Sequence, residues 1–234
     1  MNMPTLSIIV PTHNAAKTVR LLVDQLQENL KDFRFEIFLV DDASIDDTRQ
    51  EILDLVKKNS HIRHFFSTEN QGQQASLLIG LRMLPGDCDY VITMDDDLQN
   101  PVEMIRILVE KIQEGYDLVY GIPECTPGPK QKSPSVYRRL GSGLRDRLFD
   151  SFPNKPSGIK VSAFRIMTRE LAAKTAKSKK KYFYLSAESF LYDIKVANVP
   201  YSFRPRAHGK SSYTWKRLFI IYFRLLATYK FNFM

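Results

Sequence analysis

The sequence predicts an α/β fold in which a mostly parallel β-sheet is flanked by helices. Short β-rich apolar runs alternate with stretches of helical spacing over the first half of the chain, which is typical of βαβ units. The 234 residues are 44% hydrophobic and 12% aromatic, enough to fill a core and to exclude a disordered or fibrous protein. Polar clusters follow four successive expected strands, as at the ligand-binding edge of a doubly wound sheet.

Hydrophobic periodicity assigns the elements of the first half. Strands are expected at residues 6–10, 36–40, 62–66, 90–94 and 118–120, and helices at residues 16–30, 46–58, 73–84 and 101–114. The last helix has the clearest start. Asn100 can cap it, Pro101 suits its first position, and Glu103 stands where a capping-box carboxylate reaches back.

The second half is less regular. After a Pro/Gly-rich loop, the pattern predicts a basic helix at 136–149, a strand at 161–164, a helix from 168, a short helix at 187–193 and a strand at 196–203. The tail interleaves aromatic residues with cations. We therefore expect one domain over residues 1–212, with halves 1–121 and 122–212, and an amphipathic tail helix over 213–234.

Charge is distributed unevenly along the chain. Residues 1–120 carry 11 Lys+Arg and 20 Asp+Glu, whereas the rest carries 23 and 6, so a net charge of −9 is followed by +17. An acidic half can hold metal or nucleotide, and a basic half can meet phosphate or an anionic surface. Uneven solvated faces are the alternative.

The cysteine pattern and the apolar runs indicate the compartment. Cys88 and Cys125 match no metal-binding spacing, and no apolar secretory stretch follows Met1. The longest uncharged apolar run has six residues, at 218–223, far below the roughly 20 residues of a membrane span. The expectation is a reducing, cytoplasmic setting and a chain that, as given, does not cross a bilayer.

The acidic run after the fourth strand is the sharpest chemical signal. Three consecutive carboxylates repel one another and invite a cation; Asp95 and Asp97 share one side of an extended chain, and Gln99 continues that side. Oxygen ligands suit Mg²⁺ or Mn²⁺ rather than zinc. An acidic loop that favours the dipole of the next helix is the alternative reading, although Asn100 already fills the cap.

The motifs resemble a known family. SIIVPTHN, VDDAS, NQGQQASLLIGL and MDDDLQNP, in this order, resemble the nucleotide-sugar domain of family-2 glycosyltransferases with the Rossmann-like GT-A fold. DLVYGIP, SAFRIMTRE and RPRAHGKSSYTWKRL are similar, more narrowly, to polyprenyl-phosphate glycosyltransferases, the group of dolichol-phosphate mannose synthase. The resemblance covers residue 6 to about residue 218. It implies a nucleotide-sugar half, 1–121, and an acceptor-side half, 122–212.

The resemblance also implies roles for individual residues. A divalent ion would be bound by Asp95 and Asp97, with Gln99 completing its shell. It would neutralise the departing diphosphate, so that one displacement inverts the anomeric centre. The donor nucleotide would be held by the following residues, the last three being in a late basic loop: Pro11, Thr12, Asn14, Asp41 or Asp42, Gly72, Gln73, Asp95, Asp96, Arg204, Lys210 and Ser211. Asp97, Arg206 and Glu188 are the candidate catalytic residues.

Two departures from the family pattern affect the acceptor side. Relatives often carry an acidic residue shortly before the FR of SAFRIMTRE, where this chain has Val161, Ser162 and Ala163. A phosphate acceptor is already anionic near neutral pH and needs little or no base. Glu188 is the other acidic candidate, and a carboxylate on a helix surface is the alternative reading. The family's SK is Ser211-Ser212 here, which leaves Lys210 as its substitute.

These expectations describe a metal-dependent inverting glycosyltransferase that moves a sugar from a nucleotide diphosphate sugar to a polyprenyl phosphate at the cytoplasmic membrane face. Its partners would include an anionic membrane surface and a second copy of the chain, but no nucleic acid. The enzyme would act peripherally, or through transmembrane helices beyond residue 234. Transfer to a soluble saccharide or protein acceptor is the first alternative, and a non-catalytic nucleotide-binding module is the second.

Overall fold

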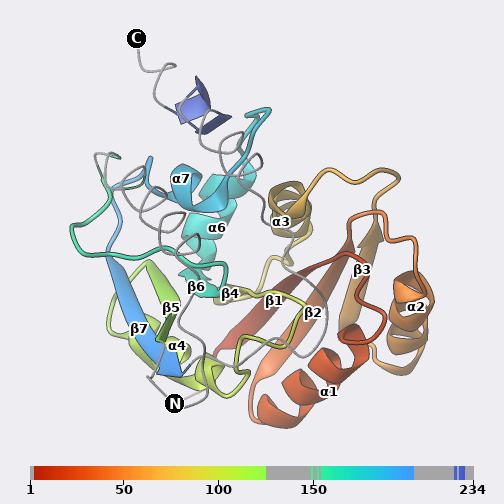
Figure 1. The fold of residues 1–234 in the computed structure, drawn as a ribbon. Coiled ribbons are helices and arrows are strands. Elements are labelled where there is room, and N and C mark those ends of the chain that lie inside the picture. Colours follow the sequence, from red (N-terminus) through yellow and green to blue (C-terminus); the bar gives the residue numbers. More distant parts are fainter. Residues whose placement is uncertain are drawn as a thin grey trace, which may run out of the picture.

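The computed structural model describes residues 3–124, 149, 152, 154–202, 224–225 and 227–229. Within them, a seven-stranded sheet has the strand order β3-β2-β1-β4-β6-β5-β7 (Figure 1). The strands are β1 (Thr5–Thr12), β2 (Arg34–Asp41), β3 (Ile62–Phe66), β4 (Tyr90–Thr93), β5 (Leu118–Glu124), β6 (Arg165–Thr168) and β7 (Val196–Ser202). The helices are α1 (Val19–Asn29), α2 (Thr48–Lys58), α3 (Gln73–Arg82), α4 (Met104–Gln113), α6 (Arg169–Ala176) and α7 (Leu185–Ser189).

Pairing in the sheet is mostly parallel. Strands β3, β2, β1 and β4 run parallel to one another, β6 pairs antiparallel with β4 and β5, and β5 pairs parallel with β7. The predicted fold class, an α/β fold with a mostly parallel sheet flanked by helices, is therefore confirmed.

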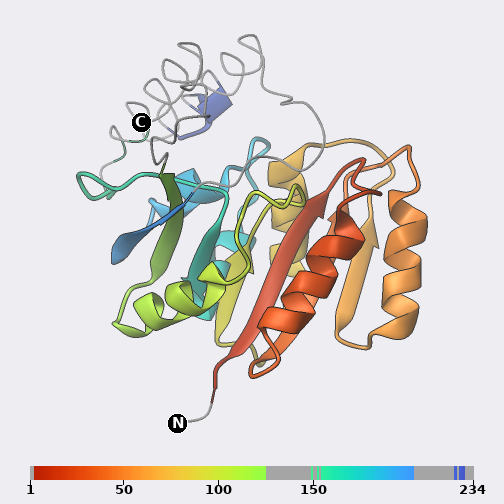
Figure 2. The ribbon, with the colours of Figure 1, turned by 60° about the horizontal axis from the view of Figure 1, so that its bottom comes forward.

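Two hydrophobic cores cover the two faces of the sheet. Helices α1, α2 and α4 pack on one face, and α3, α6 and α7 pack on the other, which Figure 2 shows from the side of α1 and α4. Alternate residues of β1 enter opposite cores: Ile8 and Val10 point into the first, and Ile9 points into the second. A strand buried on both faces reads as one continuous apolar run, which explains the run of Ile8, Ile9 and Val10 in the sequence.

The expected strand at 161–164 is wrong by four residues. The strand is β6, Arg165–Thr168, because this segment fits between β4 and β5 with Ile166 in one core and Met167 in the other. The segment before β6 is held by a side-chain hydrogen bond instead of strand pairing, since Thr93 Oγ1 donates to the carbonyl of Ala163 at 2.6 Å.

Helix starts also differ from the expectation. The helix expected from residue 16 begins at Val19, because Ala15 to Thr18 form a turn closed by Thr18 N–H on the carbonyl of Ala15. The short helix expected at 187–193 is α7, Leu185–Ser189. Helix α4 begins at Met104 and has no side-chain cap, so the predicted capping by Asn100 and Glu103 is wrong. Asn100 instead bonds within residues 95–100, which follow β4 and which we call the acidic loop.

Other expectations lie outside the described residues. Of the basic helix at 136–149 only Phe149 is described, and of the tail only five residues, which include Arg224, Leu225 and Tyr229. The division at residues 121 and 212 stays a prediction. In the part of the chain that the structure describes, no helix combines the length and the apolar character that a membrane span requires.

Gly80 allows α3 to lie directly on β1. A Cβ atom at Gly80 would stand 2.5 Å from Cγ2 of the fully buried Ile9. We expect Gly80→Ala to lower the free energy of unfolding by about 1–3 kcal/mol through overpacking, although alanine ordinarily favours a helix. Urea unfolding measures this. Gly86→Ala is the matched control, since a Cβ there meets no atom within 4 Å; equal effects of the two substitutions would contradict the packing argument.

Candidate active site

His13 joins the loops that follow three strands. Its backbone N–H donates to Asp96 Oδ2 at 3.2 Å, and its ring Nδ1 lies 2.8 Å from the carbonyl oxygen of Asp42. These loops follow β1, β2 and β4, which are neighbours in the sheet, so their carboxyl ends meet at one edge. Ligands of open α/β sheets bind at this kind of edge.

Asp42 organises the loop that leads into α3. Its Oδ1 accepts from Gln71 N–H at 2.7 Å and its Oδ2 from Gly72 N–H at 2.8 Å. Gly72 has φ of 88°, in the left-handed region that favours glycine. One carboxylate and one glycine therefore set the position of residues 70–72 and the start of α3 at Gln73.

The structure separates the two aspartates that follow β2. Asp41 is fully buried and accepts from Ser44 N–H at 3.2 Å, from the Ser44 hydroxyl, and from Arg49 Nε at 3.0 Å. Asp42 lines a cavity. Of the alternatives Asp41 and Asp42, Asp42 is the one that lines this cavity, and its contact with a nucleoside stays a prediction.

A cavity of about 890 Å³ extends from these loops along α3. Its inner end is lined by His13, Asp42 and residues 70–73, one wall by α3, and the opposite wall by Lys180, Tyr184, Arg224 and their neighbours. We call this cavity the groove. Its volume lies in the range of small-molecule sites.

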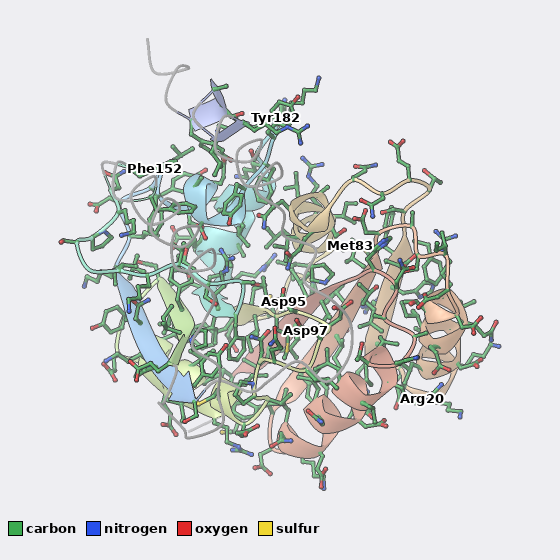
Figure 3. The ribbon with its side chains drawn as sticks, viewed as in Figure 1. Arg20, Met83, Asp95, Asp97, Phe152 and Tyr182 are labelled. Atoms are coloured by element: carbon green, nitrogen blue, oxygen red, sulfur yellow. The ribbon has the colours of Figure 1, made fainter. Side chains whose placement is uncertain are left out.

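The acidic loop lies beside the inner end of the groove. Gln73, which lines the groove, donates from Nε2 to Asp95 Oδ1. Asn100 Oδ1 accepts from Asp95 N–H at 3.0 Å, and Asn100 Nδ2 donates to the Tyr201 hydroxyl at 3.2 Å. Figure 3 shows Asp95 and Asp97 near the centre of the molecule, at the carboxyl end of β4. The loop is thus anchored both to α3 and to β7.

The donor set suits a divalent ion that is completed by a ligand. Among the described residues, no three Asp, Glu, His or Cys side chains converge as a metal cluster. Mg²⁺ commonly takes one or two carboxylates and receives its remaining ligands from substrate phosphates and water. Asp95 and Asp97 provide two half-buried carboxylates, and the turn in which Gln99 N–H donates to Asp97 Oδ1 at 3.1 Å keeps Gln99 beside them. These residues therefore fit the predicted metal role.

Burial raises the pKa of Asp96 to about 7, and the nearby carboxylates of Asp95 and Asp97 add to this effect. The backbone N–H of His13 acts in the opposite direction, because it stabilises the anion. Asp96 thus links the loop after β4 to His13. Its raised pKa and this hydrogen bond make it less suited than a free carboxylate to bind a ligand.

The remaining predicted residues of the nucleotide site are placed as follows. Pro11 and Thr12 are buried at the end of β1, where the Thr12 hydroxyl makes no hydrogen bond with the residues described. Asn14 has φ of 54° and accepts from Ile45 N–H at 3.0 Å, so it shapes the loop. Outside the described residues lie Arg204, Arg206, Lys210 and Ser211.

Glu188 is not a surface carboxylate. It is 3% exposed on α7, where it pairs with Lys180 at 3.1 Å and accepts from the Tyr229 hydroxyl at 2.9 Å. The reading of Glu188 as a helix-surface residue is therefore wrong, and burial with two partners is the reason. Its expected catalytic role stays a prediction.

Sequence reasoning missed a buried polar group beneath α7. Arg165, the arginine of SAFRIMTRE, is 2% exposed; its Nη1 donates to Ser186 Oγ at 2.7 Å, and its guanidinium lies 5.2 Å from the centre of the Tyr120 ring. A charged residue directly after the expected strand at 161–164, followed by the apolar Ile166 and Met167, was the available signal. Sequence reasoning also missed Gln74, whose Oε1 accepts from Leu185 N–H at 2.9 Å.

Comparison with known proteins assigns the family. The model of the family "Glycosyl transferase family 2" matches residues 7–175. The chain belongs to glycosyl transferase family 2. It is also 30% identical over 172 residues to the Bacillus subtilis (strain 168) protein named "Putative glycosyltransferase CsbB", a match that covers 73% of this chain and 50% of that protein. The chain thus spans about half the length of this curated relative.

Solved structures show the same fold. Glucosyl-3-phosphoglycerate synthase from Mycobacterium tuberculosis, in complex with phosphoglyceric acid, matches with a TM-score of 0.65 and 20% identity over 97% of this chain and 80% of that one. S. aureus TarS 1–349, in complex with UDP-GlcNAc, matches with a TM-score of 0.62 and 18% identity over 96% of this chain and 67% of that one. The chain therefore carries a family 2 glycosyltransferase domain with the GT-A fold.

Asp96 makes the stability of this domain pH-dependent. Its folded-state pKa is raised, so between pH 3.8 and about 7 the folded protein holds a proton that the unfolded chain has released. Metal-free stability therefore falls as pH rises through this window. At pH 8 in EDTA, we expect Asp96→Asn to be more stable than the unmodified protein by about 1–2 kcal/mol, since a tenfold change in proton affinity is worth about 1.4 kcal/mol and solvent screens part of it.

Urea unfolding at pH 8 and pH 4.5 measures this difference, which should shrink at the lower pH. Asp24→Asn, on the exposed face of α1, is the control. The assignment fails if the Asp96→Asn difference is the same at both pH values.

Proposed function

We propose that this domain is a metal-dependent inverting glycosyltransferase that transfers a sugar from a nucleotide diphosphate sugar to a polyprenyl phosphate. One observation carries the proposal. A single side chain, Gln73, both lines the groove and donates to Asp95 of the acidic loop. A nucleoside at the inner end of the groove would thus have its diphosphate next to two carboxylates that suit a divalent ion.

The nucleoside would contact Asp42 and the residues around it. Each oxygen of Asp42 already accepts one backbone N–H, and a carboxylate oxygen can accept a second hydrogen bond. The carboxylate is therefore held rigidly and can still accept from an N–H group of a base. Asn70 and His13 lie at the same end of the groove and supply further polar contacts.

Asp95, Asp97 and Gln99 would hold the ion, Mg²⁺ or Mn²⁺, on the diphosphate side. When bound, the ion supplies electrostatic stabilisation of the departing nucleoside diphosphate. The chain's own contribution is to fix the loop. Gln73 holds Asp95 from α3, and Asn100, which is itself bonded to Tyr201 of β7, accepts the backbone N–H of Asp95. Attack on the face opposite the leaving group inverts the anomeric centre.

The acceptor side supports an anionic nucleophile. In the segment before β6, where relatives often have an acidic residue, Val161 is buried and Ala163 accepts from Thr93 through its carbonyl group. This segment supplies no carboxylate, and a phosphate acceptor needs none at neutral pH. Glu188 is the acidic candidate that remains for a hydroxyl acceptor, and it is buried with Lys180 and Tyr229.

The polyprenyl part of the acceptor requires a membrane surface. Lys179, Lys181 and Arg224 are exposed, and they belong to the half of the chain that carries the excess of cations. Each cation near an anionic leaflet contributes about 1 kcal/mol. These cations support the proposal that the enzyme acts at the cytoplasmic face of a membrane.

Acceptor presented in anionic vesicles should be used faster than acceptor in neutral vesicles, and high salt should reduce this advantage. Equal rates with the two kinds of vesicle, or equal rates at low and high salt, would contradict the proposed membrane contact.

Transfer of radiolabelled sugar tests the function. UDP-, GDP- and dTDP-sugars are offered with Mn²⁺ to undecaprenyl phosphate, dolichyl phosphate, 3-phosphoglycerate and a neutral saccharide. We expect transfer to a lipid phosphate, and Asp97→Asn should lower its rate by about 10²-fold or more while leaving thermal unfolding unchanged. Asp24→Asn, far from the groove on α1, should retain the rate.

The outcomes separate the candidate functions. Turnover of phosphoglycerate or the saccharide without any lipid phosphate would replace the polyprenyl acceptor with a soluble one, a candidate favoured by the neighbour solved with phosphoglyceric acid. Full activity of a folded Asp97→Asn variant would contradict the metal role. Nucleotide binding without turnover on any acceptor would leave a non-catalytic module.

A further inference from the structure

Glu188 sits in a buried contact between two parts of the chain. Lys180 Nζ lies 3.2 Å from Oε1 and 3.1 Å from Oε2 of Glu188, and the Tyr229 hydroxyl donates to Oε2 at 2.9 Å. Lys180 Nζ also lies 5.2 Å from the centre of the Tyr229 ring. A buried carboxylate with a paired cation and a hydroxyl donor is fully satisfied, whereas loss of one partner would leave an uncompensated charge.

Tyr229 connects this contact to the wall of the groove. Its hydroxyl accepts from Tyr184 N–H at 3.1 Å while it donates to Glu188, and its ring packs against Phe152 with 6.0 Å between ring centres. Burial raises the pKa of the Tyr229 phenol, which therefore remains a donor at physiological pH. Tyr184 and Lys180 both line the groove.

Arg224 and Leu225 line the groove from the same C-terminal part of the chain as Tyr229. Arg224 lies 4.7 Å from the centre of the Tyr182 ring, which is on the outer part of the molecule, away from Asp95 and Asp97 (Figure 3). We call Arg224, Leu225 and Tyr229 the C-terminal contact. Tyr229 is its buried member, at 2% exposure.

Hydrogen bonds continue from this wall to the acidic loop. Leu185, next to Tyr184, donates its backbone N–H to Gln74 Oε1 at 2.9 Å. Gln74 is adjacent to Gln73 in the first turn of α3, and Gln73 donates to Asp95. An unbroken path of short contacts therefore runs from Tyr229 through the start of α7 and the start of α3 to a candidate metal ligand.

We propose that Glu188 is a positioning residue, which locks the C-terminal contact against α7 and so holds Gln74, Gln73 and Asp95 in their places. Glu188 acts through Tyr229 and Lys180 and does not touch the substrates. This proposal depends on the proposed function only where nucleotide binding, KM or kcat is measured. The proposal revises the expected role of Glu188 as an acceptor-side base. Lys180 and Tyr184 line the groove, whereas both carboxylate oxygens of Glu188 face Lys180 and one of them also accepts from Tyr229.

A double-mutant cycle tests the path. Tyr229→Phe removes the hydroxyl, Gln74→Ala removes the acceptor of Leu185 N–H, and both are combined. Each single substitution should weaken Mn²⁺–UDP binding, measured by calorimetry, by roughly 3- to 10-fold. The double variant should bind little more weakly than the single variant that has the larger loss of affinity. Tyr192→Phe is the matched control: its phenol donates to the carbonyl of Lys174 at 3.3 Å outside the groove, and binding should not change. Multiplicative losses in the double variant would overturn the proposal.

Glu188→Gln separates positioning from base catalysis. Glutamine still accepts from Tyr229 but loses the charge that pairs with Lys180, so we expect a higher donor KM and a loss in kcat of less than about tenfold. Removal of a general base would instead lower kcat by about 10²- to 10⁴-fold with donor binding unchanged, and that result would overturn the proposal. Glu170→Gln, which breaks only an exposed pair with Lys174, should change neither constant.

Hydrogen exchange makes the test independent of activity and of nucleotide. Tyr229→Phe should accelerate amide exchange in peptides that cover residues 70–78 and 95–100, and Tyr192→Phe should not. If the unmodified protein binds no nucleotide, the proposed function fails while faster exchange in these peptides still supports the path. Unchanged exchange in a folded Tyr229→Phe variant would overturn the path whether or not the enzyme is active.

Discussion

Parallel pairing of β1 with β2 on one side and with β4 on the other is the constraint on which the site depends. It brings three strand ends to one edge, where His13 can reach both Asp42 and Asp96. Residues that are far apart in the chain thereby become neighbours, and the short β4 delivers the acidic loop beside α3. Substitutions that move α3 relative to β1, such as those at Gly80, therefore affect the site through the fold.

The carboxylates at this edge have different tasks because their partners differ. Asp41 is hydrogen-bonded to Ser44 and paired with Arg49. Asp42 holds the loop before α3 and also lines the groove. Asp96, half-buried like its two neighbours, accepts the backbone N–H of His13. We propose Asp95 and Asp97 as the pair that shares a cation. A run of three aspartates thus contains two candidate ligands and one residue that fixes the loop.

The sequence allowed the fold class to be predicted, and it indicated that the strand-end polar clusters meet at one edge of the sheet, because strand periodicity and such clusters are local signals. It did not allow β6 to be placed, since this strand pairs with β4 and β5, and its Ile166 and Met167 enter two cores built from segments that are distant in the chain. Asn100 has the appearance of a helix cap, yet it bridges Asp95 and Tyr201. The burial of Glu188 depends on Tyr229, 41 residues further on, which no local pattern reveals.

Calorimetric titration of a nucleoside diphosphate, in Mn²⁺ and in EDTA, tests the central claim that the groove and the acidic loop form one metal-dependent donor site. UDP, GDP and dTDP are compared, and the diphosphate that binds best is paired with its nucleoside. The account predicts that Mn²⁺ tightens binding of this diphosphate by at least about tenfold and leaves binding of the nucleoside unchanged, because the ion bridges the acidic loop and the phosphates alone. Equal affinity for the diphosphate in Mn²⁺ and in EDTA would contradict it.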